Sequence, residues 1–216
     1  MDVSTAVDRR SSIRAFLDTP IPNETIAELL TKASRSPSGG NVQPWKIYVV
    51  NGESMTRFRE MLAGRDIEEP AYDVYPSGLK EPYKTARYEL GMAMYDTLGI
   101  ARDDKAGRFG QMLRNYEFFD APASIFCFFD RQMGPPQWSD LGMFLQTFML
   151  LAQEAGVDTC AQEAWAMWEG AISEFVGAPA EERLFCGVAI GHADPDEPVN
   201  ALRSERLPLE TFATFV

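Results

Sequence analysis

The sequence predicts an α+β or mixed α/β layer fold, formed as one domain over residues 1–216. Apolar runs at 45–51, 122–130 and 184–191 indicate buried strands, and segments with helical spacing separate them. The chain has 216 residues and is 45% hydrophobic, which is enough to enclose a core. A nearly all-apolar helix at 140–156 is the third observation, because one domain of this size rarely surrounds a helix completely. We therefore expect a partner subunit.

The helices are expected between these strands and on either side of them. A short helix is predicted at 2–9, and a stronger one opens at Pro22 and ends before Pro37. A turn at Gly52 leads into a third helix, and a fourth covers about 85–98. Their expected inward residues are Val3, Ala6 and Val7; Ile26, Leu29, Leu30 and Ala33; Met55, Phe58, Met61 and Leu62; and Leu90, Ala93, Met94 and Leu98. The apolar tail at 207–216 is expected to pack on the body or on another subunit.

Residues 64–84 break this pattern. They mix charges, prolines and tyrosines without a sustained period, and a connection of this length is usually functional or disordered. We expect an ordered loop or lid, in which Tyr72 and Tyr75 offer their faces to a flat ring and Lys80 offers a charge. The alternative is that the tyrosines only hold the loop against the surface.

Charge and residue counts exclude several classes of function. A net charge of −12 argues against nucleic acid or an anionic membrane as the main partner. The three cysteines form no CxxC pair and there is one histidine, so no metal site is predicted and a Ser-His-Asp triad has little scope. Signal, membrane-spanning, phosphate-loop and Rossmann patterns are all missing, so we expect a cytoplasmic protein whose chemistry comes from another kind of cofactor.

Three polar stretches stand out in this acidic chain. "RRSSIRAF" gathers Arg9, Arg10 and Arg14 around two serines, "SPSGGNVQPWK" (36–46) places a glycine-rich loop where a short turn would suffice, and "NALRSER" (200–206) carries two more arginines. Arginine forks suit phosphate, and paired glycines allow close backbone approach. Taken alone, each stretch has a simpler interpretation: surface ion pairs, with Asp2 or Asp8 for Arg9 and with Glu205 and Glu210 for Arg203 and Arg206, and a helix end with its linker for the glycines. Their occurrence together favours an anion-binding site.

These stretches, with "DLGMFLQTFMLLA" (140–152) and "GVAIGHADPDEPVNALRSERLPL" (187–209), resemble the signature sequences of the FMN-dependent nitroreductase family. Their order and spacing match the family over essentially the whole chain. The resemblance implies a three-layer α+β fold with a mixed central sheet flanked by helices. It also implies an intertwined homodimer with FMN at the subunit interface.

The resemblance assigns individual residues to the cofactor. Arg10, Ser11, Ser12 and Arg14 match the first FMN-binding motif, with Arg14 beside the ring that becomes anionic on reduction; Ser38, Gly39, Gly40, Asn41 and Gln43 match the second, which comes from the other subunit; Glu163 and Ala164 match the backbone turn at flavin N5; and Arg203 and Arg206 match positions near the phosphate. Asn115 is a candidate for the family's middle segment. No side chain is assigned as a general acid or base.

By resemblance, the function is the reduction of nitroaromatic or quinone-like acceptors, with NADH or NADPH as the electron donor in a ping-pong cycle. A small aromatic acceptor is then the partner besides the second subunit. Two alternatives stay open, namely a reductive dehalogenase or ene-reductase on the same flavin scaffold, and a flavin-binding module without catalysis. The sequence does not distinguish NADH from NADPH.

Overall fold

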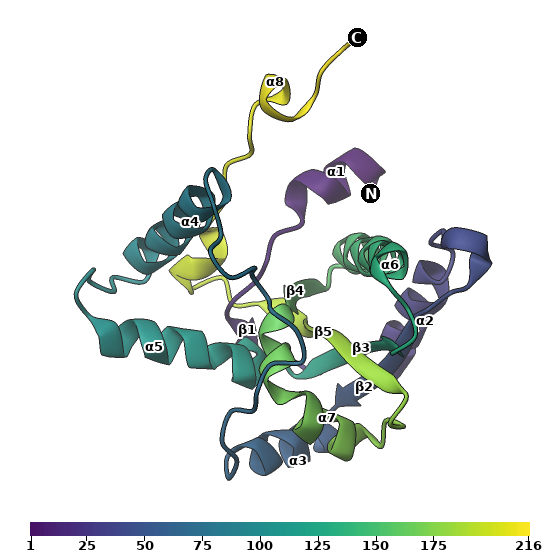
Figure 1. Ribbon diagram of the computed structural model, residues 1–216. Coiled ribbons are helices and arrows are strands. Elements are labelled where there is room, and N and C mark those ends of the chain that lie inside the picture. Colours follow the sequence, from purple (N-terminus) through teal and green to yellow (C-terminus); the bar gives the residue numbers. More distant parts are fainter.

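The computed structural model describes residues 1–216 and shows a central sheet with helices on both sides (Figure 1). The five strands are β1 (Phe16–Leu17), β2 (Lys46–Asn51), β3 (Ala123–Asp130), β4 (Asp158–Gln162) and β5 (Glu182–Ala193). They follow the order β1-β5-β3-β2, and β4 also pairs with β5. The two longest strands, β3 and β5, therefore form the centre of the sheet.

The strands predicted from the sequence are β2, β3 and β5, and the α+β class is confirmed. The resemblance implies a mixed sheet, but every ladder between named strands is antiparallel. Parallel pairing is limited to an isolated bridge between Ser12 and Thr159. The chain after Ser12 leaves β4 at once and forms β1, which is two residues long, so no parallel ladder develops.

The helices divide between the two faces of the sheet and a region beside it (Figure 1). Their bounds are α1 (Val3–Arg9), α2 (Asn23–Ala33), α3 (Glu53–Leu62), α4 (Tyr83–Thr97), α5 (Lys105–Leu113), α6 (Pro135–Glu154), α7 (Glu169–Val176) and α8 (Leu209–Phe212). Short 3-10 turns are η1 (Gly39–Asn41), η2 (Arg114–Asp120), η3 (Glu163–Trp168) and η4 (Pro198–Ala201). None of the helices combines the length and the apolar character needed to cross a bilayer.

Alternation along β3 builds two cores, one on each face of the sheet. Ile125, Cys127 and Phe129 belong to a cluster with α2 and α6, whereas Phe126 and Phe128 belong to a cluster with α3, η2, η3 and α7. Successive side chains of a strand point to opposite faces, so a strand covered on both sides is apolar throughout. This accounts for the unbroken apolar run that predicts β3, and it confirms the three-layer arrangement.

Two parts of the chain stand away from these cores. Helix α4 has no buried residue, and its predicted inward residue Leu90 is 41% exposed. The prediction that α4 packs inward is wrong for the protomer, because α4 lies beside η4 and not on the sheet (Figure 1). The C-terminal arm (207–216) extends beyond the body and leaves Phe212 and Phe215 exposed. The expected packing of this tail is thus not met within one chain.

Candidate functional site

The first and third of the polar stretches, which carry the arginines, meet at one cavity that we name the arginine cavity. It measures about 520 Å³ and lies between the residues after α1 and those after η4. Its lining residues are Val7, Asp8, Arg10, Ser11, Ser12, Arg14, Leu90, Gln146, Leu202, Arg203, Ser204 and Arg206. The fold therefore brings together two predicted groups that lie near opposite ends of the sequence.

The arginines of this cavity have no carboxylate partners. The ion pairs of the protein involve other residues, so the surface pairs that offered a simpler interpretation do not form. Arg14 Nη1 donates to Ser12 O at 3.2 Å, Arg203 Nη1 to Asn200 O at 2.9 Å, and Arg206 Nη1 to Ser204 Oγ at 2.6 Å. Grouped cations repel one another, so an anion held among them would be stabilised.

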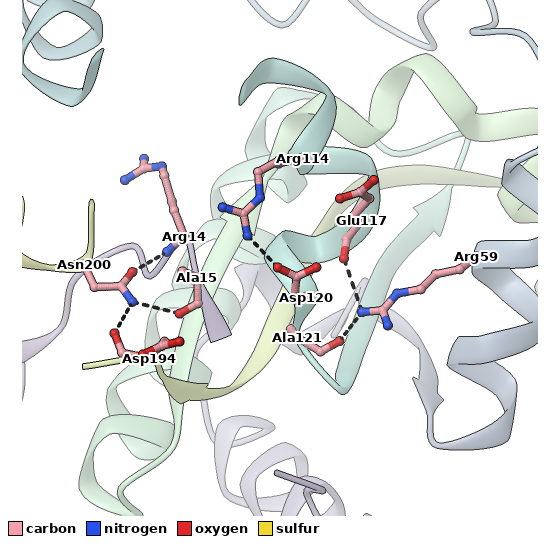
Figure 2. Close-up of polar contacts among 9 residues, drawn as sticks. All are labelled: Arg14, Ala15, Arg59, Arg114, Glu117, Asp120, Ala121, Asp194 and Asn200. Carbon is pink, nitrogen blue, oxygen red and sulfur yellow. Dashed lines mark hydrogen bonds and ion pairs between the residues drawn. The ribbon is translucent and has the colours of Figure 1, made fainter. Parts of the chain in front are cut away.

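Asn200 in η4 fixes the position of Arg14 (Figure 2). Its Oδ1 accepts the Arg14 backbone N–H at 2.9 Å, and its Nδ2 donates to Ala15 O at 2.8 Å and to Asp194 O at 3.0 Å. The side chain thereby ties the segment after α1 to the loop that follows β5. Asn200 was not singled out from the sequence, although it begins the third polar stretch, because an isolated asparagine in a loop carries no distinctive signal.

A second cavity, which we name the aromatic cavity, opens beside the first. It measures about 530 Å³ and is lined by Arg14, Tyr75, Ala86, Arg87, Leu90, Gly91, Met94, Tyr95, Gln111, Met112, Asn115, Phe119 and Leu202. It shares Arg14, Leu90 and Leu202 with the arginine cavity. Arg14 therefore lies where a strongly basic cavity meets a mainly apolar one.

Asn115 links the aromatic cavity to the turn that follows β4. Its main-chain and side-chain oxygens accept from Gln162 Nε2 at 2.8 and 3.2 Å, and Gln162 is 3% exposed. Glu163 and Ala164 come next, at the start of η3. Burial raises the pKa of the Cys160 thiol on β4 to about 11, so this thiol stays protonated at neutral pH. Ile13, the neighbour of Arg14, donates its backbone N–H to Thr159 O on the same strand at 3.1 Å. The predicted residues Arg14, Asn115 and Glu163 thus occupy one region.

The 3-10 turn η2, which forms part of the wall of the aromatic cavity, has an unusual backbone. Phe118, Phe119 and Asp120 have φ of 53°, 54° and 70°, the left-handed region that non-glycine residues rarely adopt. Arg59 Nη2 donates to Ala121 O at 2.8 Å and to Glu117 O at 3.3 Å, so it clamps both ends of this turn (Figure 2). Phe119 lines the aromatic cavity, so Arg59 on α3 supports the wall from behind.

Comparisons with known proteins agree with this geometry. The family model described as "Nitroreductase family" matches residues 7–192. The chain belongs to the nitroreductase family. Chloronitrobenzene nitroreductase of Comamonas testosteroni is 35% identical over 97% of this chain and 94% of its own, and 4-nitrobenzoate reductase of Pseudomonas putida is 33% identical over 100% and 96%.

Solved structures extend the likeness to the whole fold. The FMN- and NADPH-dependent nitroreductase NfnB of Sphingopyxis sp. strain HMH is 43% identical, with a TM-score of 0.96 over 100% of this chain and 99% of that one. NfnB of Mycobacterium smegmatis, an FMN-dependent nitroreductase solved with NADPH, is 28% identical with a TM-score of 0.91 over the full length of both. The family resemblance predicted from the sequence is confirmed.

The glycine-rich loop of this nitroreductase lies apart from the arginine cavity. Gly40, Asn41 and Gln43 have positive φ of 58°, 57° and 48°, and Asn41 and Gln43 are exposed. The Gly39 N–H donates to the Asp140 carboxylate at 3.2 Å, which anchors the loop at the start of α6. Helix α2 ends at Ala33, so the helix-end interpretation of the glycines is wrong. None of Ser38–Gln43 lines the arginine or the aromatic cavity.

The loop between α3 and α4 separates the two predicted substrate tyrosines. Tyr72 donates its hydroxyl to Phe185 O, its ring centroid lies 5.8 Å from that of Trp138, and burial raises its pKa. Tyr72 therefore holds the loop on the body. Tyr75 is 50% exposed and lines the aromatic cavity. Lys80 is exposed and does not line this cavity.

The beginning of the same loop is fixed by Glu68. Its carboxylate accepts the N–H groups of Gly170 and Ala171 at 2.7 and 2.8 Å, at the N-terminal end of α7. A carboxylate at this end of a helix satisfies free N–H groups and opposes the positive end of the helix dipole. Residues up to Tyr72 are therefore held on the body, whereas the remainder of the loop leads to the cavity.

Proposed function

We propose that this nitroreductase is an NAD(P)H-dependent flavoenzyme that reduces nitroaromatic or quinone-like acceptors with bound FMN. The observation that carries the proposal is the arginine cavity, in which four guanidinium groups without carboxylate partners surround two serines in a chain of net charge −12. The names of the relatives support the choice of nitroaromatic acceptors. FMN fits this site because its phosphate is a dianion, which arginine binds with paired hydrogen bonds.

Different residues of the arginine cavity would bind different parts of FMN. Arg10, Arg203 and Arg206, with Ser11 and Ser12, would hold the phosphate. Arg14 lies at the junction with the aromatic cavity and would stabilise the negative charge that the reduced cofactor carries. The chemistry that FMN supplies when bound is two-electron transfer from NAD(P)H to the acceptor. No protein side chain then needs to act as a general acid or base.

The remaining predicted residues complete the binding site. The turn at Glu163 and Ala164 would present a backbone N–H to flavin N5, and Asn115 would hold that turn through Gln162. The glycine-rich loop lies apart from the cavity of its own chain, and we infer that it completes the cavity of a second chain. Exposed apolar residues on the arm and on α4 support this homodimer, with FMN at the interface.

We also propose a cytoplasmic location and a small aromatic acceptor as the partner in the reaction. All three cysteines are buried free thiols, as in proteins of a reducing compartment. Tyr75, Tyr95 and Phe119 line the aromatic cavity, and their rings suit a flat acceptor.

A visible spectrum during anaerobic titration tests the function directly. The purified protein is expected to be yellow, to lose this colour with NADPH or NADH, and to regain it with a nitroarene such as nitrobenzene. A yellow protein that neither dinucleotide reduces would indicate a binding module. A protein that takes up no FMN would refute the proposal.

A further inference from the structure

A third cavity continues the series beyond the aromatic cavity, and we name it the cationic cavity. It measures about 780 Å³ and lies between α4, the start of α5 and the end of the loop that carries Tyr75. It shares Tyr75, Arg87, Gly91 and Tyr95 with the aromatic cavity. A ligand in the aromatic cavity that is long enough would therefore reach it, on the side away from Arg14.

The charge of this cavity is entirely positive. Lys84, Arg87 and Arg108 line it, and neither Asp nor Glu does. None of the three cations takes part in an ion pair. The chain carries 32 acidic and 20 basic residues, so a lining with cations alone departs from its composition. Such a lining concentrates a positive potential and attracts anions.

Arg108 is the most informative of the three. Its guanidinium carbon lies 4.7 Å from the Tyr95 ring centroid, and its Nη2 donates to Met92 Sδ at 3.4 Å. Its Nε is buried and has no hydrogen-bond partner. The Nε atoms of Arg59 and Arg183 are buried without a partner as well, so this atom alone indicates no ligand. Arg108 Nη1 forms no hydrogen bond and is not buried, so it is the donor that can reach an anion in the cavity. The aromatic and sulfur contacts hold the group in place and leave donors free.

Aromatic rings surround these cations. The Arg87 guanidinium carbon lies 4.1 Å from the centroid of the Tyr75 ring, and Tyr88 also lines the cavity. Stacking of arginine on a ring fixes the plane of the guanidinium while its edge remains available for hydrogen bonds. Planar aromatic surface beside fixed cations suits a ligand that combines a flat ring with an anionic group.

We propose that the cationic cavity binds the anionic group of a reactant that occupies the aromatic cavity, with Arg108 and Arg87 as the residues that determine this specificity. The group is a phosphate or a carboxylate. It belongs either to the dinucleotide donor, as the 2′-phosphate that distinguishes NADPH from NADH, or to an aromatic acceptor that carries a carboxylate. The inference rests on the proposed function and adds the chemical class of the reactant.

Variants of the cavity are compared with a matched control elsewhere. Arg108→Ala and Arg87→Ala remove one guanidinium each, and Arg87 is exposed, so its variant is expected to fold even if Arg108→Ala does not. Arg102→Ala is the control, because Arg102 is also exposed and does not line the cavity. FMN content, read from the visible spectrum, is expected to be unchanged in all three, since none of these residues lines the arginine cavity.

The readout is the contrast between paired ligands. Calorimetry measures the affinity for 2′,5′-ADP against 5′-AMP, which differ by the 2′-phosphate, and for 4-nitrobenzoate against nitrobenzene, which differ by the carboxylate. Steady-state kinetics measures KM for NADPH against NADH and for the same two acceptors. In one of the two pairs, we expect Arg108→Ala to weaken binding of the ligand that carries the anionic group by roughly 10- to 100-fold. Binding of the matched ligand without that group should change by less than about twofold. Loss confined to the 2′-phosphate pair assigns the donor, and loss confined to the carboxylate pair assigns the acceptor.

Equal effects on both members of each pair, or no effect on either pair in Arg108→Ala and Arg87→Ala, would overturn the proposal and leave the stacked arginines as supports of α4 and α5. Failure of the proposed function is seen separately, because a wild-type protein without FMN or without reduction by either dinucleotide would fail before any variant is made.

Discussion

At the scale of single residues, function is indicated by charges that lack partners. Arg65, Arg114, Arg131 and Arg183 pair with carboxylates on the surface of the protein. Arg14 and Arg206 instead contact main-chain or serine oxygens beside a cavity. The sequence alone indicates that Arg9, Arg10 and Arg14 form a basic cluster, but only the structure shows that Arg14 and Arg206 have no carboxylate partner.

Replacement of Arg14 by Ala is expected to weaken the binding of FMN and to lower the reduction potential of the bound cofactor. A hydrogen bond to a charged group contributes about 1.5–3 kcal/mol, which corresponds to roughly 30–60 mV for a two-electron couple. The measurements are FMN fluorescence titration and anaerobic potentiometry. Arg9→Ala is the matched control, because Arg9 belongs to the same stretch but does not line the arginine cavity. An unchanged potential with unchanged affinity would remove the role assigned to Arg14.

Tyr72→Phe is expected to lower stability without a change in acceptor kinetics. The hydroxyl donates to Phe185 O, and its loss leaves that oxygen without this partner, at a cost of about 1 kcal/mol. Urea unfolding measures the change, and stopped-flow reoxidation by a nitroarene measures the kinetics. Tyr75→Ala gives the contrast, since Tyr75 lines the aromatic cavity and its loss should slow reoxidation. Slower reoxidation in Tyr72→Phe at unchanged stability would instead favour contact with the acceptor.

At the scale of elements, periodicity predicts what is strongly patterned and misses what is short or polar. Helix α6 and strand β3 follow from their apolar residues, because burial imposes that pattern. Strand β4 reads "DTCAQ" and is held in place by pairing with β5, and α5 contains Gly107 and Gly110, which weaken a helical prediction. Pairing with β5 decides β4, for which the sequence offers no local signal, whereas α5 does begin at a local one, the Asp104 side chain that accepts the Gly107 N–H at 2.8 Å.

The same limit applies to the candidate site. Its basic stretches were visible in the sequence, whereas the cavity that contains Arg87 and Arg108 depends on where α4 and α5 lie. Helix α4 was expected to pack inward because Leu90 and Met94 have helical spacing. In the protomer these side chains line the aromatic cavity instead. A helix that faces a ligand and a helix that faces a core can share one pattern.

Arg59→Ala is expected to relax the left-handed turn in η2 and to disturb the cavity wall that the turn supports. Loss of two hydrogen bonds from a charged donor predicts destabilisation of about 2–4 kcal/mol. Urea unfolding measures this loss. Since Phe119 lines the aromatic cavity, KM for a nitroarene should rise while FMN affinity stays near that of the wild type. Arg57→Ala on the exposed side of the same helix is the control. Equal stability of the two variants would contradict the clamp.

At the scale of the whole molecule, one chain leaves too much apolar surface uncovered. Leu207, Leu209, Phe212 and Phe215 on the arm are 53–87% exposed, and Met143 on α6 is 39% exposed. Contiguous apolar surface on a protein usually marks an interface. The loop of Ser38–Gln43 also presents polar groups away from the arginine cavity. A second copy of the chain would account for both features, because it would cover the apolar surface and receive the loop.

Met143→Glu is therefore expected to yield a monomer that retains its helices but loses FMN. Met143 faces away from the core, unlike Leu145 on the same helix, so the substitution places a charge on the expected interface without disrupting the protomer. An unpaired charge buried at an interface costs several kcal/mol, enough to dissociate a dimer. Sedimentation with absorbance at the flavin band reports mass and cofactor together, and far-UV circular dichroism reports helix content. Ala27→Glu, at an exposed position of α2, is the control and should remain dimeric and yellow. A Met143→Glu protein that sediments as a dimer with stoichiometric FMN would place the interface elsewhere, and a wild-type monomer that holds FMN would refute the shared site.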